Sequence, residues 1–199
     1  MINRAPLRSA NREKGATLAK MHILLAFAPF IAFALIDRLV GSLAGLLAGA
    51  VIALLLLGRD WMVQKHSPKI LDIGTALLFS GLLLYFLIAK PVWSVIGVRL
   101  CVDCGLLLIV LISLAVGKPF SLQYAREHVG REFWESPQFQ KTNYVISSAW
   151  ALAFAVMVIA ELSILLAPQL PRRFGIIVIV LALVGAVKFT GWYPERVRR

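Results

Sequence analysis

The chain has 199 residues, of which 60% are hydrophobic and 16% are charged, and its mean hydropathy is +0.83. A water-soluble domain cannot bury so much apolar surface, so this composition excludes an ordinary soluble fold. The formal net charge of +11 does not indicate a nucleic-acid-binding protein, because the basic residues are spread over separate polar segments and do not cluster with aromatic residues.

The chain divides into apolar segments separated by short polar connections. Most apolar segments approach the roughly 20 residues that cross about 30 Å of hydrocarbon as a helix. Because lipid cannot satisfy backbone polar groups, such segments must be helical and must pack together. The sequence therefore predicts an all-α fold, a polytopic membrane helix bundle of one domain with six transmembrane helices. The predicted spans are residues 21–36, 39–57, 70–89, 92–116, 143–167 and 174–190, with basic tails at 1–20 and 191–199 and a polar loop at 117–142.

The distribution of basic residues predicts the orientation of the bundle. Sixteen Lys and Arg residues lie in the two tails and in the second and fourth connections, whereas four lie in the first, third and fifth connections. Positively charged segments next to membrane spans are retained in the cytoplasm. Both ends of the chain are therefore predicted to be cytoplasmic.

The first apolar segment allows two alternatives. If residues 21–36 do not cross the membrane, the protein has five spans and an external N-terminus, which the basic tail disfavours. The pattern Ala32-Phe33-Ala34 also imitates a signal-peptide cleavage site. Cleavage there would place the next apolar run almost at the new N-terminus, so an uncleaved hairpin that turns at Asp37-Arg38 is the simpler interpretation.

Gly41, Gly45 and Gly49 form a repeated G-x-x-x-G pattern on the second predicted span. Glycines at this spacing lie along one helix face and admit a neighbouring helix at close range. The pattern predicts tight packing against the first or third span. A homodimer contact, or a sliding surface used in a conformational change, is the alternative interpretation.

Several charged residues are predicted to lie at membrane depth. Arg99 and Asp103 in the fourth span are four residues apart and so share a helix face. Glu161 in the fifth span and the Asp37-Arg38 turn are predicted to lie in the same outer half. Because such charges are costly unless paired or hydrated, we expect either a polar pocket that binds a headgroup or solute or passes protons, or a static salt-bridge cluster. Asp72 is predicted to be a separate first-turn charge at the inner boundary.

Cys101 and Cys104 form a C-x-x-C pattern in the middle of the fourth span. Reactive pairs of this kind need an electropositive, partly exposed setting, but these two residues point away from Arg99 and Asp103 on the helix. The pattern therefore favours small packing residues over a thiol oxidoreductase. The sequence shows no metal-ligand spacing, no catalytic motif and no cofactor motif.

The loop before the fifth span combines aromatic and charged residues, a composition suited to a segment at the membrane surface. Ser136-Pro137 is typical of a helix N-cap followed by proline at the first helical position. A solvated surface helix is the simple interpretation of the loop, and a site for a protein partner or an anionic lipid is the alternative. The residues of that candidate site are Tyr124, Arg126, Glu127, His128 and Trp134.

The order of these features resembles the intracellular septation protein A family of bacterial inner-membrane proteins. The similarity lies in a first span closing on Asp37, a small-residue second span, Lys118-Pro119 after the fourth span, Asn143 and Trp150 at the start of the fifth, and a basic end. The resemblance implies a multi-pass protein of the bacterial inner membrane. It also implies a role in cell-envelope maintenance or septation through protein or lipid partners, and it supplies no catalytic residues.

Three functions follow from these observations. The leading hypothesis is the non-enzymatic envelope role, exerted through a membrane-protein partner, a homodimer or lipid. The alternative is a small transporter or lipid-handling protein that uses the intramembrane charges. A thiol oxidoreductase that acts through Cys101 and Cys104 comes third.

Overall fold

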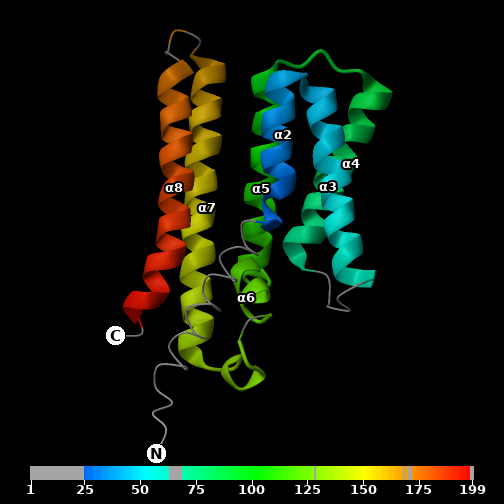
Figure 1. The fold of residues 1–199 in the computed structure, drawn as a ribbon. Helices are drawn as coiled ribbons and strands as arrows, with labels where there is room; N and C mark the ends of the chain where they lie inside the picture. Colours follow the sequence, from blue (N-terminus) through cyan, green and yellow to red (C-terminus); the bar gives the residue numbers. More distant parts are fainter. Residues whose placement is uncertain (1–24, 63–68, 128, 168, 170–171, 198–199) are drawn as a thin grey trace, which may run out of the picture.

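The computed structural model describes residues 25–62, 69–127, 129–167, 169 and 172–197, and every regular element in those residues is helical (Figure 1). This confirms the predicted all-α class. The elements are α2 (Ala28–Leu39), α3 (Ser42–Met62), α4 (Ile70–Ala89), α5 (Val95–Ala115), α6 (Phe120–Ala125), the 3-10 helix η1 (Arg131–Phe133), α7 (Pro137–Leu166) and α8 (Arg172–Val197).

Five of the described helices, α3, α4, α5, α7 and α8, are long and apolar enough to cross a membrane. A helix of about 20 residues is about 30 Å long, which matches the hydrocarbon thickness of a bilayer. The chain is thus a multi-pass membrane protein. α2 has only 12 residues, and residues 21–24 of the predicted first span lie outside the described residues, so the sixth span stays a prediction.

The first hairpin turns at Val40-Gly41, so the predicted turn at Asp37-Arg38 is wrong. Asp37 and Arg38 lie in the last turn of α2. Gly41 has a φ of +125°, a conformation that L side chains rarely adopt, so glycine allows the chain to reverse here. The prediction failed because a charged pair was interpreted as a surface turn, whereas the Asp37 side chain is buried in the bundle.

Local sequence sets the start of α5 and α7. The Ser94 hydroxyl accepts a hydrogen bond from the backbone N–H of Gly97, and the Ser136 hydroxyl accepts one from that of Phe139. Pro137 occupies the first position of α7, which confirms the predicted N-cap and proline. Because α7 starts at this cap, it extends beyond the predicted span 143–167 on its N-terminal side, and α8 extends past residue 190 to Val197.

The helices form two groups that meet where α5 packs on α7 (Figure 1). α7 and α8 lie side by side in one group, and α2, α3, α4 and α5 form the other. One end of the bundle is here named the Asp37 end. It is the end at which α2, α4 and α7 finish and α3, α5 and α8 begin. The opposite end, where α3 finishes and α4 starts, is named the Lys69 end.

Two apolar clusters hold α2 inside the bundle. Phe27, just before α2, stacks on Trp150 of α7 with ring centroids 4.6 Å apart. Phe79 of α4 is fully buried and contacts the rings of Phe30 and Phe33 of α2. α2 is therefore anchored to both α4 and α7.

Candidate functional site

An ion pair at the Asp37 end connects α2 to α5. Nε of Arg99 donates to Oδ2 of Asp37 at 2.7 Å, and Nη2 of Arg99 lies 2.6 Å from the same oxygen. The hydroxyl of Ser42 donates to Oδ1 at 2.7 Å. The Asp37 side chain is 0% exposed and that of Arg99 is 34% exposed. Both oxygens of this buried carboxylate are therefore satisfied.

Two glycines of α3 allow the close helix packing around this pair. A Cβ on Gly45 would lie 2.9 Å from the Cβ of Asp37, and a Cβ on Gly49 would lie 2.6 Å from ring carbons of Phe79. Both glycines thus pack within the chain, on α2 and α4 respectively. Gly41 lies in the turn, and nothing is within 4 Å of a Cβ built on it. The predicted packing stripe is therefore reduced to Gly45 and Gly49, because its first position precedes α3.

Asp103 of α5 and Glu161 of α7 lie next to the ion pair. Glu161 is within electrostatic range of Asp103, Arg99 and Asp37, and Asp103 is within range of Arg99. Glu161 is 6% exposed, and its Oε2 is buried without a hydrogen-bond partner among the described residues. The structure therefore brings four of the five predicted charges together, whereas the side chain of Arg38 is exposed. These four, Asp37, Arg99, Asp103 and Glu161, are named the Asp37 cluster.

The charges of the Asp37 cluster do not balance. Three carboxyl groups share one guanidinium, and Asp37 already engages two nitrogens of that guanidinium. A carboxylate without a counter-charge is costly at membrane depth. A proton on Asp103 or Glu161 would remove one of these negative charges, so the cluster has the composition of a proton-binding site.

A second buried cluster, at the Lys69 end, was not predicted. Lys69 precedes α4, and its Nζ lies 2.5 Å from Oδ2 of Asp60, 2.8 Å from Oε1 of Glu127 and 3.7 Å from Oδ2 of Asp72. Nη2 of Arg59 donates to the other oxygen of Asp60 at 2.8 Å. Lys69, Asp60 and Asp72 are each less than 8% exposed. One ammonium group thus joins the end of α3, the start of α4 and the segment after α6.

Tyr124 of α6 completes this second cluster. Its hydroxyl donates to Oδ1 of Asp72 at 2.6 Å, and Nζ of Lys69 lies 4.7 Å from its ring centroid. Burial and the charge of Asp72 raise the pKa of the Tyr124 phenol well above its ordinary value, so it stays a donor. Burial lowers the pKa of Lys69, but its hydrogen bonds with Asp60 and Glu127 and the charge of Asp72 outweigh this, and the pKa lies above its ordinary value.

A cavity of about 10 Å³ lies among these side chains and is lined in part by Asp60, Lys69, Asp72 and Tyr124. This is close to the smallest space that holds one water molecule. Asp72 does lie in the first turn of α4 as predicted, but it belongs to this shared network. The Lys69 cluster, consisting of Arg59, Asp60, Lys69, Asp72, Tyr124 and Glu127, is therefore tightly packed.

The sequence gives only a weak signal for the Lys69 cluster. Tyr124 and Glu127 are three residues apart, a spacing that places two side chains on one helix face. Their partner Asp72 lies 52 positions before Tyr124 in the chain. The contact depends on how α6 packs against the start of α4, where Gln123 also accepts a hydrogen bond from the backbone N–H of Ile70.

The candidate partner-binding loop divides into two parts. Tyr124 and Glu127 face the Lys69 cluster. Trp134 instead lies beside two guanidinium groups. The guanidinium of Arg126 is 5.2 Å from the centroid of the Trp134 ring, and the guanidinium of Arg131 is 5.7 Å from it. Both distances are within the range of cation–π contacts. The second part is therefore a cationic and aromatic surface feature, named the Trp134 patch.

The described residues include both cysteines of the chain and none of its three histidines. Cys101 and Cys104 are free, and Cys104 is exposed on α5. No group of three His, Cys, Asp or Glu residues could hold a metal ion among the described residues. His128 lies outside the described residues.

Comparisons with protein-family models, with curated proteins and with solved structures found no match to this chain.

Proposed function

We propose that this protein is a small proton-coupled transporter and that Asp103 and Glu161 carry the coupling proton. The observation that supports this function is the buried Oε2 of Glu161, which lacks a hydrogen-bond partner among the described residues. It lies near Asp103, and the nearby guanidinium of Arg99 is already engaged by Asp37. Ionisable groups on facing membrane helices are typical of proton relays and ion pathways.

The proposal includes six spans, with both ends of the chain in the cytoplasm of a bacterial cell and the bundle in the inner membrane. The excess of basic residues in the tails and in the second and fourth connections supports this orientation. The Asp37 end then faces outward, and the Lys69 cluster lies at the cytoplasmic surface.

Each residue of the Asp37 cluster has a role in the proposed mechanism. Asp37 holds Arg99 in place through two guanidinium nitrogens. Arg99 is 34% exposed and Asp103 is partly exposed, so a polar solute or water reaches the cluster through these two side chains. Asp103 and Glu161 share one proton, because both carboxylates cannot stay charged near each other at this depth. Release of that proton leaves both carboxylates charged. Because this state is costly at membrane depth, proton release favours a conformational change, and this couples proton binding to transport.

Charge displacement in proteoliposomes tests this function. A pH jump outside liposomes that contain the full-length protein should produce a transient current on a solid-supported membrane. Glu161→Gln and Asp103→Asn should each reduce it strongly, because each removes an exchangeable carboxyl group. Glu132→Gln is the matched control, because Glu132 is exposed in η1, outside both clusters. An unchanged current in the Glu161→Gln/Asp103→Asn variant would refute the proposal.

Thermal unfolding of the neutralised variant distinguishes transport from static pairing. Glu161→Gln/Asp103→Asn leaves the ion pair of Asp37 and Arg99 intact, so the transporter proposal expects loss of the current while the fold is retained. Loss of the fold together with the current would favour a salt-bridge cluster that only fixes helix order.

The Trp134 patch supports a second candidate, the non-enzymatic envelope role implied by the resemblance to the septation protein family. An aromatic ring with two guanidinium groups beside it suits contact with a protein partner or with anionic headgroups. A photo-reactive residue at Phe133, which is 51% exposed, should form a discrete cross-linked product in cells. Trp134→Ala should weaken that product. Its absence from cells that contain the folded protein would count against this role.

A further inference from the structure

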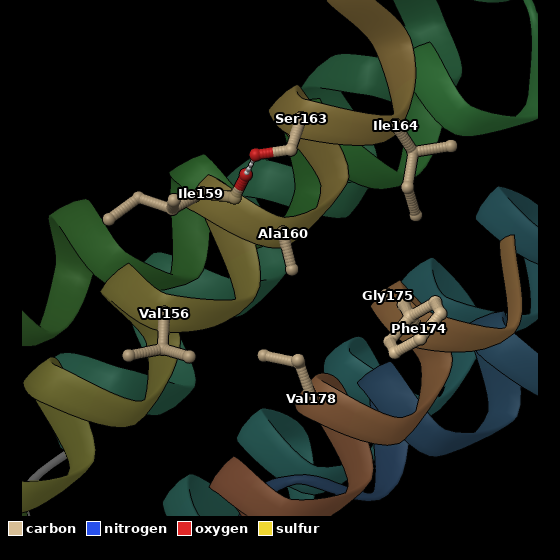
Figure 2. Close-up of a pocket in the computed structure, with 8 residues that line it drawn as sticks. All are labelled: Val156, Ile159, Ala160, Ser163, Ile164, Phe174, Gly175 and Val178. Atoms are coloured by element: carbon tan, nitrogen blue, oxygen red, sulfur yellow. Dashed lines mark hydrogen bonds between the residues drawn. The ribbon is translucent and has the colours of Figure 1, made fainter. Parts of the chain in front are cut away.

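The cavity in the Lys69 cluster has a polar lining, unlike the larger groove between α7 and α8. That groove has a volume of about 300 Å³ and a mainly apolar lining (Figure 2). Figure 2 shows the hydroxyl of Ser163 donating to the backbone oxygen of Ile159, at 2.7 Å, so this polar atom of the lining is satisfied. The cavity of about 10 Å³ is instead lined in part by Arg59, Asp60, Lys69, Asp72 and Tyr124. A ligand of this cavity must therefore be polar and about the size of one water molecule.

One polar contact beside this cavity is too long for a direct hydrogen bond. Nζ of Lys69 lies 3.7 Å from Oδ2 of Asp72. Tyr124 donates to the other oxygen of Asp72, and Oδ2 is buried without a hydrogen-bond partner among the described residues. The ammonium group of Lys69 has three N–H donors, and its two shorter contacts are with Asp60 and Glu127. A donor and an acceptor at this separation, next to a water-sized space, are suited to a bridging water molecule.

The cavity adjoins the surface at the Lys69 end of the bundle. Arg59 lines the cavity, and its side chain is 37% exposed. Nη2 of Arg59 donates to Oδ1 of Asp60, whose other oxygen contacts Lys69, so the guanidinium lies next to the buried ion pair. A water molecule in the cavity therefore has a short route to solvent past Arg59.

A second unpartnered polar atom lies beyond Asp72 in α4. Thr75 is three residues further on and shares a helix face with Asp72. It is 2% exposed, and its Oγ1 has no hydrogen-bond partner among the described residues. One turn further, the buried ring of Phe79 contacts Phe33, which precedes Asp37 by one turn of α2. Phe79 therefore separates Thr75 from the Asp37 cluster in this structure, and a polar path between them requires Phe79 to move.

We propose that the cavity binds one water molecule between Lys69 and Asp72, and that Asp72 passes the coupling proton through this water to solvent at the Lys69 end. In this step Oδ2 of a protonated Asp72 gives its proton to the water, and the resulting hydronium ion releases the proton to solvent past Arg59. Asp72 remains as a carboxylate that accepts the hydrogen bond of Tyr124 and faces the ammonium group of Lys69. The passage of the proton rests on the proposed transport, whereas the binding of water does not.

Radiolytic hydroxyl labelling of the full-length protein, read by mass spectrometry, tests the water site, because radicals formed from a bound water oxidise the nearest side chain. Tyr124 lines the cavity and is only 4% exposed, and it should be labelled. Phe120 of the same helix is fully buried away from the cavity and should stay unlabelled.

Two leucine variants show whether the label comes from the cavity. Leu56→Phe fills the cavity from α3 and should remove the label from Tyr124. Leu57→Phe is the matched control, the same change at the adjacent, partly exposed residue that does not line the cavity. An unlabelled Tyr124 in the wild type, or equal labelling of Tyr124 in the two variants, would overturn the binding of water.

Charge displacement in proteoliposomes tests the role of Asp72. Asp72→Asn should slow the decay of the transient current, because it removes the carboxyl group that passes the proton to solvent. Leu56→Phe, which removes the water and leaves Asp72 in place, should slow it as well, whereas Glu132→Gln should not. Azide, a small weak acid that carries protons, should restore the decay in Asp72→Asn and should produce no current in Glu161→Gln/Asp103→Asn.

The outcomes separate this role from the proposed transport. A wild-type decay in Asp72→Asn and Leu56→Phe, with the current still lost in Glu161→Gln/Asp103→Asn, would overturn the role of Asp72 and leave the transport proposal intact. A slow decay that azide does not restore would make Asp72 a structural residue and would also overturn the role. Thermal unfolding of each variant shows that only folded proteins are compared.

Discussion

Arg99 and Asp37 are 62 positions apart in the sequence, and Nε of Arg99 lies 2.7 Å from a carboxylate oxygen of Asp37. The contact joins the last turn of α2 to the start of α5. The two side chains differ in exposure, since that of Asp37 is 0% exposed and that of Arg99 is 34% exposed. Loss of Arg99 leaves a carboxylate buried, whereas loss of Asp37 leaves a guanidinium that reaches the surface. The two partners therefore contribute unequally to stability.

Removal of Arg99 should destabilise the protein more than removal of Asp37. Arg99→Met should lower the free energy of unfolding by about 3–5 kcal/mol, because it strands a buried charge. Asp37→Asn should lower it by about 1–2 kcal/mol, through weaker hydrogen bonds. Denaturant titration of the purified protein in micelles measures both. The double variant should cost less than the sum of the single variants, and additive effects would contradict a direct pair.

Gly49 should tolerate alanine poorly. A Cβ at this position would lie 2.6 Å from the buried ring of Phe79, so Gly49→Ala should cost about 1–3 kcal/mol. Gly81→Ala is the control, because nothing lies within 4 Å of a Cβ built there, and it should stabilise α4 by about 0.5–1 kcal/mol. The same denaturant titration distinguishes them. Similar effects of the two substitutions would show that α3 and α4 are not packed as described.

Lys69 should be important for stability although it lies near a loop. Its ammonium group holds Asp60 and Glu127, and Asp72 is also close, so Lys69→Met should cost about 3–5 kcal/mol by leaving buried carboxylates without their counter-charge. Lys118→Met, at an exposed lysine, should change stability by less than about 0.5 kcal/mol. Thermal unfolding in micelles measures the difference. Equal melting temperatures for the two variants would contradict the Lys69 cluster.

The stability of the protein should fall at alkaline pH because of Tyr124 and Lys69. Both have pKa values above their ordinary ones in the folded state, so the folded protein keeps these protons to higher pH than the unfolded chain. Their contribution is complete below the unfolded pKa values of about 10 and 10.4 and decreases as pH rises above them. Melting temperatures between about pH 8 and 11 should fall less steeply for Tyr124→Phe than for wild type. Parallel pH profiles would show that Tyr124 is not buried against Asp72.

The helical class could be predicted because it depends on local composition. A bilayer requires long apolar helices, and such runs are visible in the sequence. The helix N-cap at Ser136-Pro137 was predictable for the same reason, since it needs only neighbouring residues. The end of α2 was not predictable in this way, because the buried Asp37 is paired with Arg99, 62 positions away in the sequence.

The sequence predicts roughly where the charges of the Asp37 cluster lie along their helices, but it does not predict which of them form the ion pair. The rise per residue places Arg99, Asp103 and Glu161 in one half of the membrane. Arg99 and Asp103 share a helix face, which suggested that they pair. The structure instead pairs Arg99 with Asp37 of α2, a contact between helices that are distant in sequence. The Lys69 cluster required the packing of α6 on α4, and no local pattern reports such a contact.

The central claim of the proposed function is that Glu161 and Asp103 together hold one proton. Infrared difference spectroscopy of the protein in liposomes, recorded between neutral and alkaline pH in H₂O and in D₂O, detects the C=O stretch of a protonated carboxylic acid. The proposed mechanism predicts a band for a buried acid that shifts in D₂O, is lost at alkaline pH, and disappears in Glu161→Gln/Asp103→Asn while persisting in Glu132→Gln. A spectrum of the double variant identical to that of the wild type would contradict it.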